Sequence, residues 1–177
     1  IAFSAPVLGA LADAGDLKRK FLISFAFLGI IATGYLFFIP ESSWKLAVIF
    51  YGIGVIGFSG GNIFYDSLLV AVSKEKERNR VSALGFSLGY LGGGILFLIN
   101  VIMFLYPNRF GLENQIEAVL CSFLSVAVWW LVFSLPIYLN VKEPIQNVYK
   151  KQLNAIITDA FRNLLNTARS FKKFKSA

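Results

Sequence analysis

The 177-residue sequence contains no histidine and a single cysteine, Cys121. The absence of histidine removes the most common general base and the most common metal ligand. One cysteine can form neither a disulfide within the chain nor a cysteine-based metal site. The sequence therefore predicts no metal site and no cofactor, and it offers few groups from which a catalytic centre could be built.

Charged residues are also scarce, at 15% of the chain, whereas apolar residues make up 56% and the mean hydropathy is +0.66. Soluble domains contain about 45–50% apolar residues on a comparable count. The excess here is concentrated in long blocks, and a soluble fold of this length would need far more polar surface. A lipid bilayer removes that need, so the composition predicts an all-α membrane protein with the bilayer as its partner.

Four apolar runs are each long enough to cross a bilayer, because about 20 residues of helix span a hydrocarbon core of roughly 30 Å. A shorter apolar segment, residues 1–12, contains Pro6, and we expect it to be the end of a further helix whose beginning is absent. The four expected spans are residues 21–39, 46–72, 81–106 and 118–141.

The basic residues are distributed unequally between the segments that separate these spans. If the helices alternate in direction, 15 of the 17 lysines and arginines fall on one side, and only Lys45 and Arg109 fall on the other. Loops rich in Lys and Arg face the cytoplasm. The net charge of +7 is therefore explained by membrane orientation, and we expect no nucleic-acid partner.

The last segment, residues 142–177, has a different character from the apolar runs. Its apolar positions follow a spacing of three and four residues, and lysines and arginines occupy the opposite face. We expect a linker containing a basic amphipathic helix. This helix either lies on the inner membrane surface or packs as a soluble helix against the cytoplasmic face of the protein.

One acid lies inside an expected span, about seven residues from the next loop. Asp66 is costly to place in a membrane, and an ionisable residue there favours a functional role. It could bind a substrate amine, carry a coupling proton, pair with Arg80 or the basic turn, or extend its side chain to the interface. Asn62 lies one helical turn earlier on the same face, and Tyr65 is adjacent in sequence. These three residues could form one polar stripe.

The third apolar run carries a stripe of glycines at intervals of four residues: Gly85, Gly89 and Gly93, with Gly94 beside them. Such a stripe is typical of close helix packing. Asn100 lies in the same run and either lines a solute path or bridges two helices. Three residues of the last run are expected to serve in packing, namely Cys121, Trp129 and Trp130.

Short motifs in the chain resemble those of a known transporter superfamily. Residues 9–13, followed by the basic residues 18–20, resemble the loop between the second and third helices of the major facilitator superfamily. Other segments are similar to its vacuole-effluxer branch, which is associated with autophagy and has many bacterial members: residues 64–69, 80–85, 89–94 and 161–165.

The resemblance implies a fold and a function. The fold would be part of the N-terminal six-helix bundle, from late in helix 2 to the central linker, with the C-terminal half of the protein missing. The function would be secondary active transport of a small polar solute by alternating access, with amino-acid export suggested by the branch. A membrane scaffold or channel subunit is the alternative, and a membrane-embedded enzyme is less favoured, so we predict no enzyme activity.

The same resemblance suggests roles for individual residues. Asp13 would act as a gate, although it could instead be a solvated charge that ends a helix. Tyr90 takes the position of a proline in the fifth-helix pattern of antiporter-type members. The protein would be multi-pass, in the cell membrane of a bacterium or in a vacuolar membrane. The expected gating residues are Gly9, Asp13, Lys18 and Arg19, and the expected solute or ion path comprises Asn62, Tyr65, Asp66, Tyr90 and Asn100.

Overall fold

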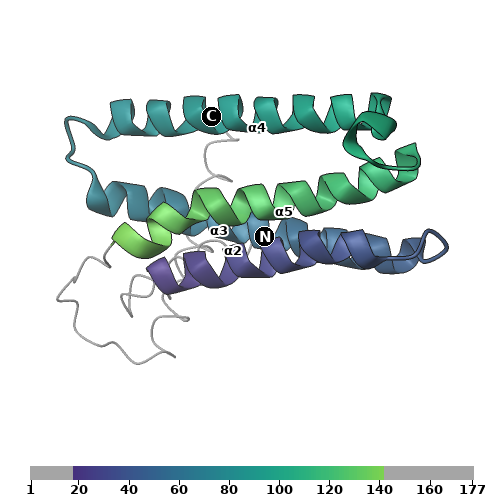
Figure 1. Ribbon diagram of the computed structural model, residues 1–177. Helices are drawn as coiled ribbons and strands as arrows, with labels where there is room; N and C mark the ends of the chain where they lie inside the picture. The colour runs from purple at the N-terminus through teal and green to yellow at the C-terminus, as the bar shows by residue number, and fades with distance from the viewer. Residues whose placement is uncertain (1–17, 142–177) are drawn as a thin grey trace, which may run out of the picture.

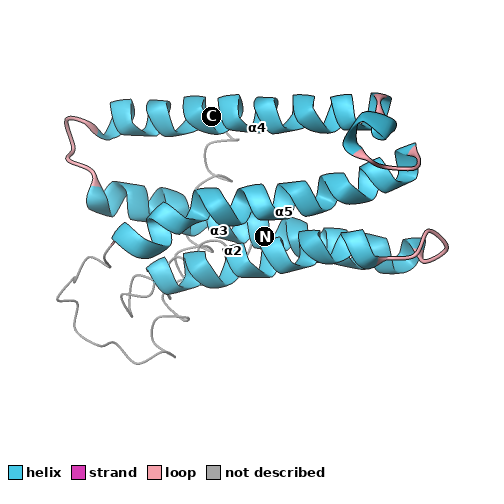
Figure 2. Ribbon diagram, in the orientation of Figure 1, coloured by secondary structure: helices cyan, strands magenta, loops and turns pink. Residues whose placement is uncertain are grey.

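The computed structural model describes residues 18–141, and every regular element in this range is a helix (Figure 2). Each of the four long helices is long and apolar enough to cross a membrane. The all-α prediction is thereby confirmed for the described residues, while the six-helix bundle stays a prediction. The elements are α2 (Lys18–Tyr35), η1 (Leu36–Phe38), α3 (Trp44–Val72), α4 (Arg78–Leu105), η2 (Pro107–Phe110) and α5 (Gln115–Asn140).

The four helices lie over the four expected spans, and their ends differ from the expected limits by no more than four residues. The differences arise mainly at the starts, where α2 and α4 begin with charged residues that an apolar run excludes. A helix can take its first turn from polar residues because the first four backbone N–H groups have no partner within the helix. Residues 1–12 and 142–177, with their predicted helices, lie outside the described range.

Consecutive helices run in opposite directions, so the connections alternate between the two ends of the bundle (Figure 1). The start of α2, the α3–α4 loop and the end of α5 lie at one end, while the other two connections lie at the opposite end. Local hydrogen bonds fix these connections. Before α5, the Asn114 side chain accepts a bond of 2.9 Å from Glu117 N, and the Glu117 carboxylate accepts one of 2.7 Å from Glu113 N.

The best packed part of the molecule is the contact of α2 with α3 and α5. Phe64 is fully buried and stacks between Phe21 and Phe25, with ring centroids 5.2 and 5.7 Å away. Farther along, a Cβ atom on Gly57 would lie 2.5 Å from the backbone nitrogen of Gly29. The two backbones can approach this closely because Gly57 lacks a side chain.

Helix α4 has a different environment from the other three helices. Only Leu96 and Met103 of α4 are buried, and 80% of Tyr90 is exposed. In Figure 1, α4 runs along one side of the bundle and approaches α5 most closely near its C-terminal end. Much of the face that α4 turns toward the bundle therefore borders open space, and this space contains the candidate site.

The glycine stripe of α4 borders this open space. A Cβ atom on Gly89, Gly93 or Gly94 would meet no atom within 4 Å, and one on Gly85 would meet the Tyr65 hydroxyl at 3.0 Å. Among residues 18–141, the stripe thus faces open space instead of a closely packed helix. Its role in helix packing stays a prediction. The tight glycine contacts that the described helices do form involve α2 and α3.

Candidate functional site

Two grooves border the inner face of α4. The first, which we name the Asp66 groove, has a volume of about 620 Å³ and lies between α3 and α4. It brings together four of the five residues that the sequence places along a solute path, and Asn100 is the one left out. The α3 wall comprises Phe58, Asn62, Tyr65 and Asp66, and the α4 wall comprises Gly85, Phe86, Gly89 and Tyr90.

Helical spacing explains the α3 wall. Phe58, Asn62 and Asp66 follow one another at intervals of four residues, so they lie along one face of the helix. Tyr65 adds a second row beside them, and its hydroxyl reaches α4 at Gly85, where a side chain would crowd it. The missing side chain at Gly85 thus leaves room for the tyrosine. Tyr65 is half-buried, whereas Asp66 and Asn62 are exposed to the groove.

The environment of Asp66 settles one of the alternatives raised by the sequence. Within residues 18–141 no basic side chain forms an ion pair with Asp66, so pairing with Arg80 does not occur in this structure. Among the described residues, Asp66 is also the only charged residue that lines either groove. Its carboxylate is therefore the dominant charge in this open space.

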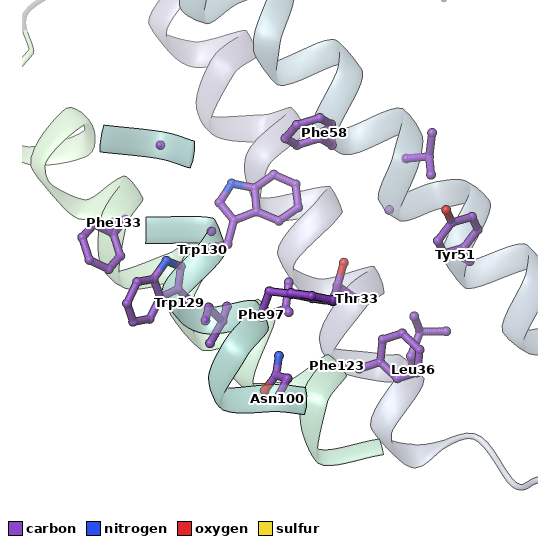
Figure 3. Close-up of a pocket in the computed structure, with 16 residues that line it drawn as sticks. Thr33, Leu36, Tyr51, Phe58, Phe97, Asn100, Phe123, Trp129, Trp130 and Phe133 are labelled. Atoms are coloured by element: carbon purple, nitrogen blue, oxygen red, sulfur yellow. The ribbon is translucent and has the colours of Figure 1, made fainter. Parts of the chain in front are cut away.

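The second groove, which we name the aromatic groove, has a volume of about 680 Å³ and is lined by all four long helices (Figure 3). Its lining is almost wholly apolar. Trp129 packs on Phe133 with centroids 4.6 Å apart, and Trp130 meets Phe58 edge to face at 6.0 Å. The ring-bearing residues of this groove are Tyr51, Phe58, Phe97, Phe123, Trp129, Trp130 and Phe133.

Asn100 supplies an amide to the aromatic groove and also joins two helices. The Ser125 hydroxyl of α5 donates to Asn100 Oδ1 at 2.9 Å, and it also lies 2.8 Å from the Ser122 carbonyl oxygen. In Figure 3 the amide nitrogen of Asn100 points toward the groove. Asn100 thus bridges α4 with α5 and lines the aromatic groove, while its place on a solute path stays a prediction.

The two tryptophans make packing contacts and also border the aromatic groove. The ring of Trp130 presses on Gly29 of α2 so closely that a Cβ there would overlap it. Both Trp129 and Trp130 also line the aromatic groove. Cys121 is half-buried in α5 and lines neither groove.

The two grooves are adjacent, because Phe58 and Gly89 line both of them. Phe58 belongs to α3 at this junction. On the α4 side, a Cβ atom on Gly89 would meet no atom within 4 Å. A smaller cavity of about 150 Å³ adjoins the junction between α2, α3 and α5 and shares Asn62 and Tyr65 with the Asp66 groove.

The expected gating residues divide between described and undescribed parts of the chain. Gly9 and Asp13 lie outside the described residues. Lys18 and Arg19 open α2, and the Arg19 guanidinium donates a hydrogen bond to the backbone carbonyl of Tyr138 near the end of α5. This bond satisfies one of the carbonyl groups that a helix C-terminus leaves without a partner. Arg19 therefore ties the ends of α2 and α5 together.

Several groove residues were not expected from the sequence. Phe58 could have been found, since it continues the four-residue spacing of Asn62 and Asp66 by one turn. Phe86 and Phe97 carry no comparable signal, because an aromatic residue in an apolar run is usually in contact with lipid or other helices. Among residues 18–141, no three metal-ligating side chains gather at one place.

In the described part of the chain, long apolar helices thus border grooves that contain one acid and a few neutral polar groups, as is typical of a multi-pass membrane protein. Comparison with known proteins agrees with this class. The family model described as "Vacuole effluxer Atg22 like" matches residues 1–76 and 70–177, which together cover the whole sequence, and the chain belongs to this family. The membership confirms the resemblance drawn from the motifs.

A curated relative gives the scale of the match. The chain is 36% identical over 177 residues to an uncharacterized MFS-type transporter, YxiO, of Bacillus subtilis strain 168. The alignment covers 99% of this chain and 41% of the relative, so the chain spans about two fifths of the relative's length. No solved structure matches the chain. Together with the four apolar helices, the relationship establishes a multi-pass membrane protein of the major facilitator type.

Proposed function

We propose that the two grooves line the path of a secondary active transporter that moves a small polar solute, with amino acids as the first candidates. The observation that supports this proposal is the composition of the Asp66 groove. An acid, an amide and two tyrosine hydroxyls from two helices line one open space. Polar groups are costly at membrane depth and are placed there for function.

Transport would proceed by alternating access, in which two helical bundles rock about a central site. Helices α2–α5 would belong to one bundle, and the rest of the protein, outside the two fifths covered here, would supply the other. Gly85, Gly89, Gly93 and Gly94 would then face the partner bundle or the solute. In this arrangement the partner bundle or the solute would cover the face of α4 that residues 18–141 leave open.

The cytoplasmic end would carry the gate. Asp13 would be the acidic residue of that gate and Gly9 would allow close helix approach, with Lys18 and Arg19 as its basic residues. The bond from Arg19 to the Tyr138 carbonyl supports a role for this end in holding α2 against α5. We propose the cytoplasmic membrane of a bacterium as the location, since the relative is bacterial. A vacuolar membrane would be the counterpart in a eukaryote.

The test is solute flux by the full-length protein reconstituted in vesicles, measured in both directions with a panel of radiolabelled amino acids. We expect counterflow of at least one member and a loss of about tenfold or more in Asp66→Asn, because an ionic hydrogen bond to the solute disappears. Glu75→Gln removes a carboxylate from the exposed α3–α4 loop and serves as the matched control. Flux that Asp66→Asn leaves unchanged would exclude Asp66 from the mechanism.

A further inference from the structure

Tyr65 and Gly85 face each other at the same depth in the bundle. Tyr65 lies seven residues before the end of α3 at Val72, and Gly85 lies seven residues after the start of α4 at Arg78. Each is therefore about 10 Å of helix away from the α3–α4 loop. A Cβ atom on Gly85 would lie 3.0 Å from the Tyr65 hydroxyl, so the hydroxyl occupies the notch that the missing side chain leaves. Tyr65 thus spans the distance from α3 to α4.

This contact lies at one end of the Asp66 groove. Asp66 and Gly85 are the described lining residues that lie nearest to the α3–α4 loop, and the other described lining residues extend away from the loop along both helices. Tyr65 also packs against the buried cluster around Phe64, which α2 and α3 share. A tyrosine that rests on this core and reaches across to α4 forms a floor to the groove on its loop side.

Tyr65 has room to leave this position. Together with Phe58 and Asn62, it also lines the cavity of about 150 Å³ between α2, α3 and α5. Tyr138 lines the same cavity, and its buried hydroxyl has no hydrogen-bond partner among the described residues, although buried polar groups are normally paired. A change of the Tyr65 side-chain rotamer would move its ring from the notch into the cavity, where the Tyr138 hydroxyl can pair with its own.

We propose that Tyr65 is a gate of the Asp66 groove. In the observed, closed position its ring separates the groove from the α3–α4 loop, with the hydroxyl in the notch at Gly85. In the open position the ring lies in the small cavity, and a solute beside Asp66 has a route toward the loop end of the bundle. This inference rests on the proposed function, since it assumes that solute passes through the groove, and it adds a residue that controls the passage.

Labelling of a cysteine inside the groove measures the state of the gate. In the full-length protein without other cysteines, including Cys121→Ser, Asn62→Cys places a thiol one helical turn farther from the loop than Asp66. A small, membrane-impermeant methanethiosulfonate would be added to intact cells and, separately, to inside-out vesicles. The two preparations give the rate of labelling from each side of the membrane.

Changes at Tyr65 should act on one side only. Tyr65→Ala removes the ring and should raise labelling from the side that the α3–α4 loop faces by at least about tenfold, because the minor state of a two-state element is only about 0.1–10% populated. Labelling from the opposite side should not change. Tyr65→Phe and Tyr138→Phe should each lower loop-side labelling by about fivefold, since each removes one hydroxyl of the hydrogen bond in the open position.

The notch provides a second, independent variant. Gly85→Val fills it and should displace the Tyr65 ring, so loop-side labelling should rise toward the rate of Tyr65→Ala. Gly52→Val adds the same side chain to α3 outside the groove, where a Cβ atom meets nothing within 4 Å, and should have no effect. Unchanged labelling from the opposite side shows in each case that the helices remain folded.

Two results would overturn the inference. In the first, Tyr65→Ala leaves loop-side labelling unchanged, and in the second it raises labelling equally from both sides, as a loosened bundle would. Amino-acid flux by the unaltered protein separates this inference from the proposed function. Flux together with either of these results removes the gate and leaves the transporter standing. The expected labelling in a protein that moves no solute supports closure of the groove by Tyr65 and contradicts the transport function.

Discussion

At the scale of single residues, glycines set how closely α2 packs against α3 and α5. Gly57 of α3 faces the backbone of Gly29, and Gly29 in turn receives the ring of Trp130 from α5. Gly60 has a similar role, because the ring of Phe25 lies over it. The three-helix contact is thus built on positions where any side chain would overlap a neighbour. By contrast, Gly52 in the same helix meets nothing within 4 Å.

Gly57→Ala should destabilise the protein, whereas Gly52→Ala should not. The new methyl group at position 57 would lie 2.5 Å from backbone atoms of Gly29, which cannot rotate away, and overpacking of this kind costs about 1–3 kcal/mol. At position 52 the same change adds no clash and gains up to about 1 kcal/mol of helix propensity. Thermal unfolding of both full-length variants in one detergent measures the difference. Equal midpoints would contradict the proposed contact.

At the scale of whole elements, α4 separates the well-packed side of the bundle from the grooves. It is held to α5 by the Asn100–Ser125 hydrogen bond and touches α3 where Tyr65 reaches Gly85. Between these two points its inner face borders the two grooves. The glycines along this face determine how wide the grooves can be, and Gly89 stands at the point where they meet.

A bulky side chain at Gly89 should therefore obstruct the path without disturbing the fold. Gly89→Leu is expected to reduce solute flux by about tenfold or more, while its unfolding midpoint stays near that of the unaltered protein, because a Cβ there meets no described atom within 4 Å. Gly52→Leu places the same volume on α3 outside both grooves and should leave flux unchanged. Loss of flux in both variants would indicate a general effect of bulk on the helices.

The sequence predicted the helices well because the signal for each is local. An uncharged run of about 20 residues specifies a span wherever its neighbours lie, and the spacing of Asn62 and Asp66 places both on one face of α3. The grooves, by contrast, depend on which helix faces meet and on how closely the helices approach one another. Nothing in the glycine stripe itself distinguishes a packed face from an open one, and the aromatic lining comes from four helices whose arrangement is tertiary.

At the scale of the whole molecule, the alternation of the helices divides the described basic residues between two ends. Lys18, Arg19 and Lys20 at the start of α2, together with Lys74, Lys76, Arg78 and Arg80 around the α3–α4 loop, lie at one end. Only Lys45 and Arg109 belong to the other. The α3–α4 loop and the adjoining helix ends should therefore face the cytoplasm.

This orientation predicts opposite labelling of two loops. In a full-length background that lacks other cysteines, including Cys121→Ser, a membrane-impermeant maleimide added to intact cells should modify Glu41→Cys and leave Glu75→Cys unmodified. Both original residues are exposed, so access to the label depends on the side of the membrane and not on burial. After permeabilisation both variants should react. If only Glu75→Cys reacts in intact cells, the orientation is reversed, and the gate proposed around Lys18 and Arg19 would lie outside the cell.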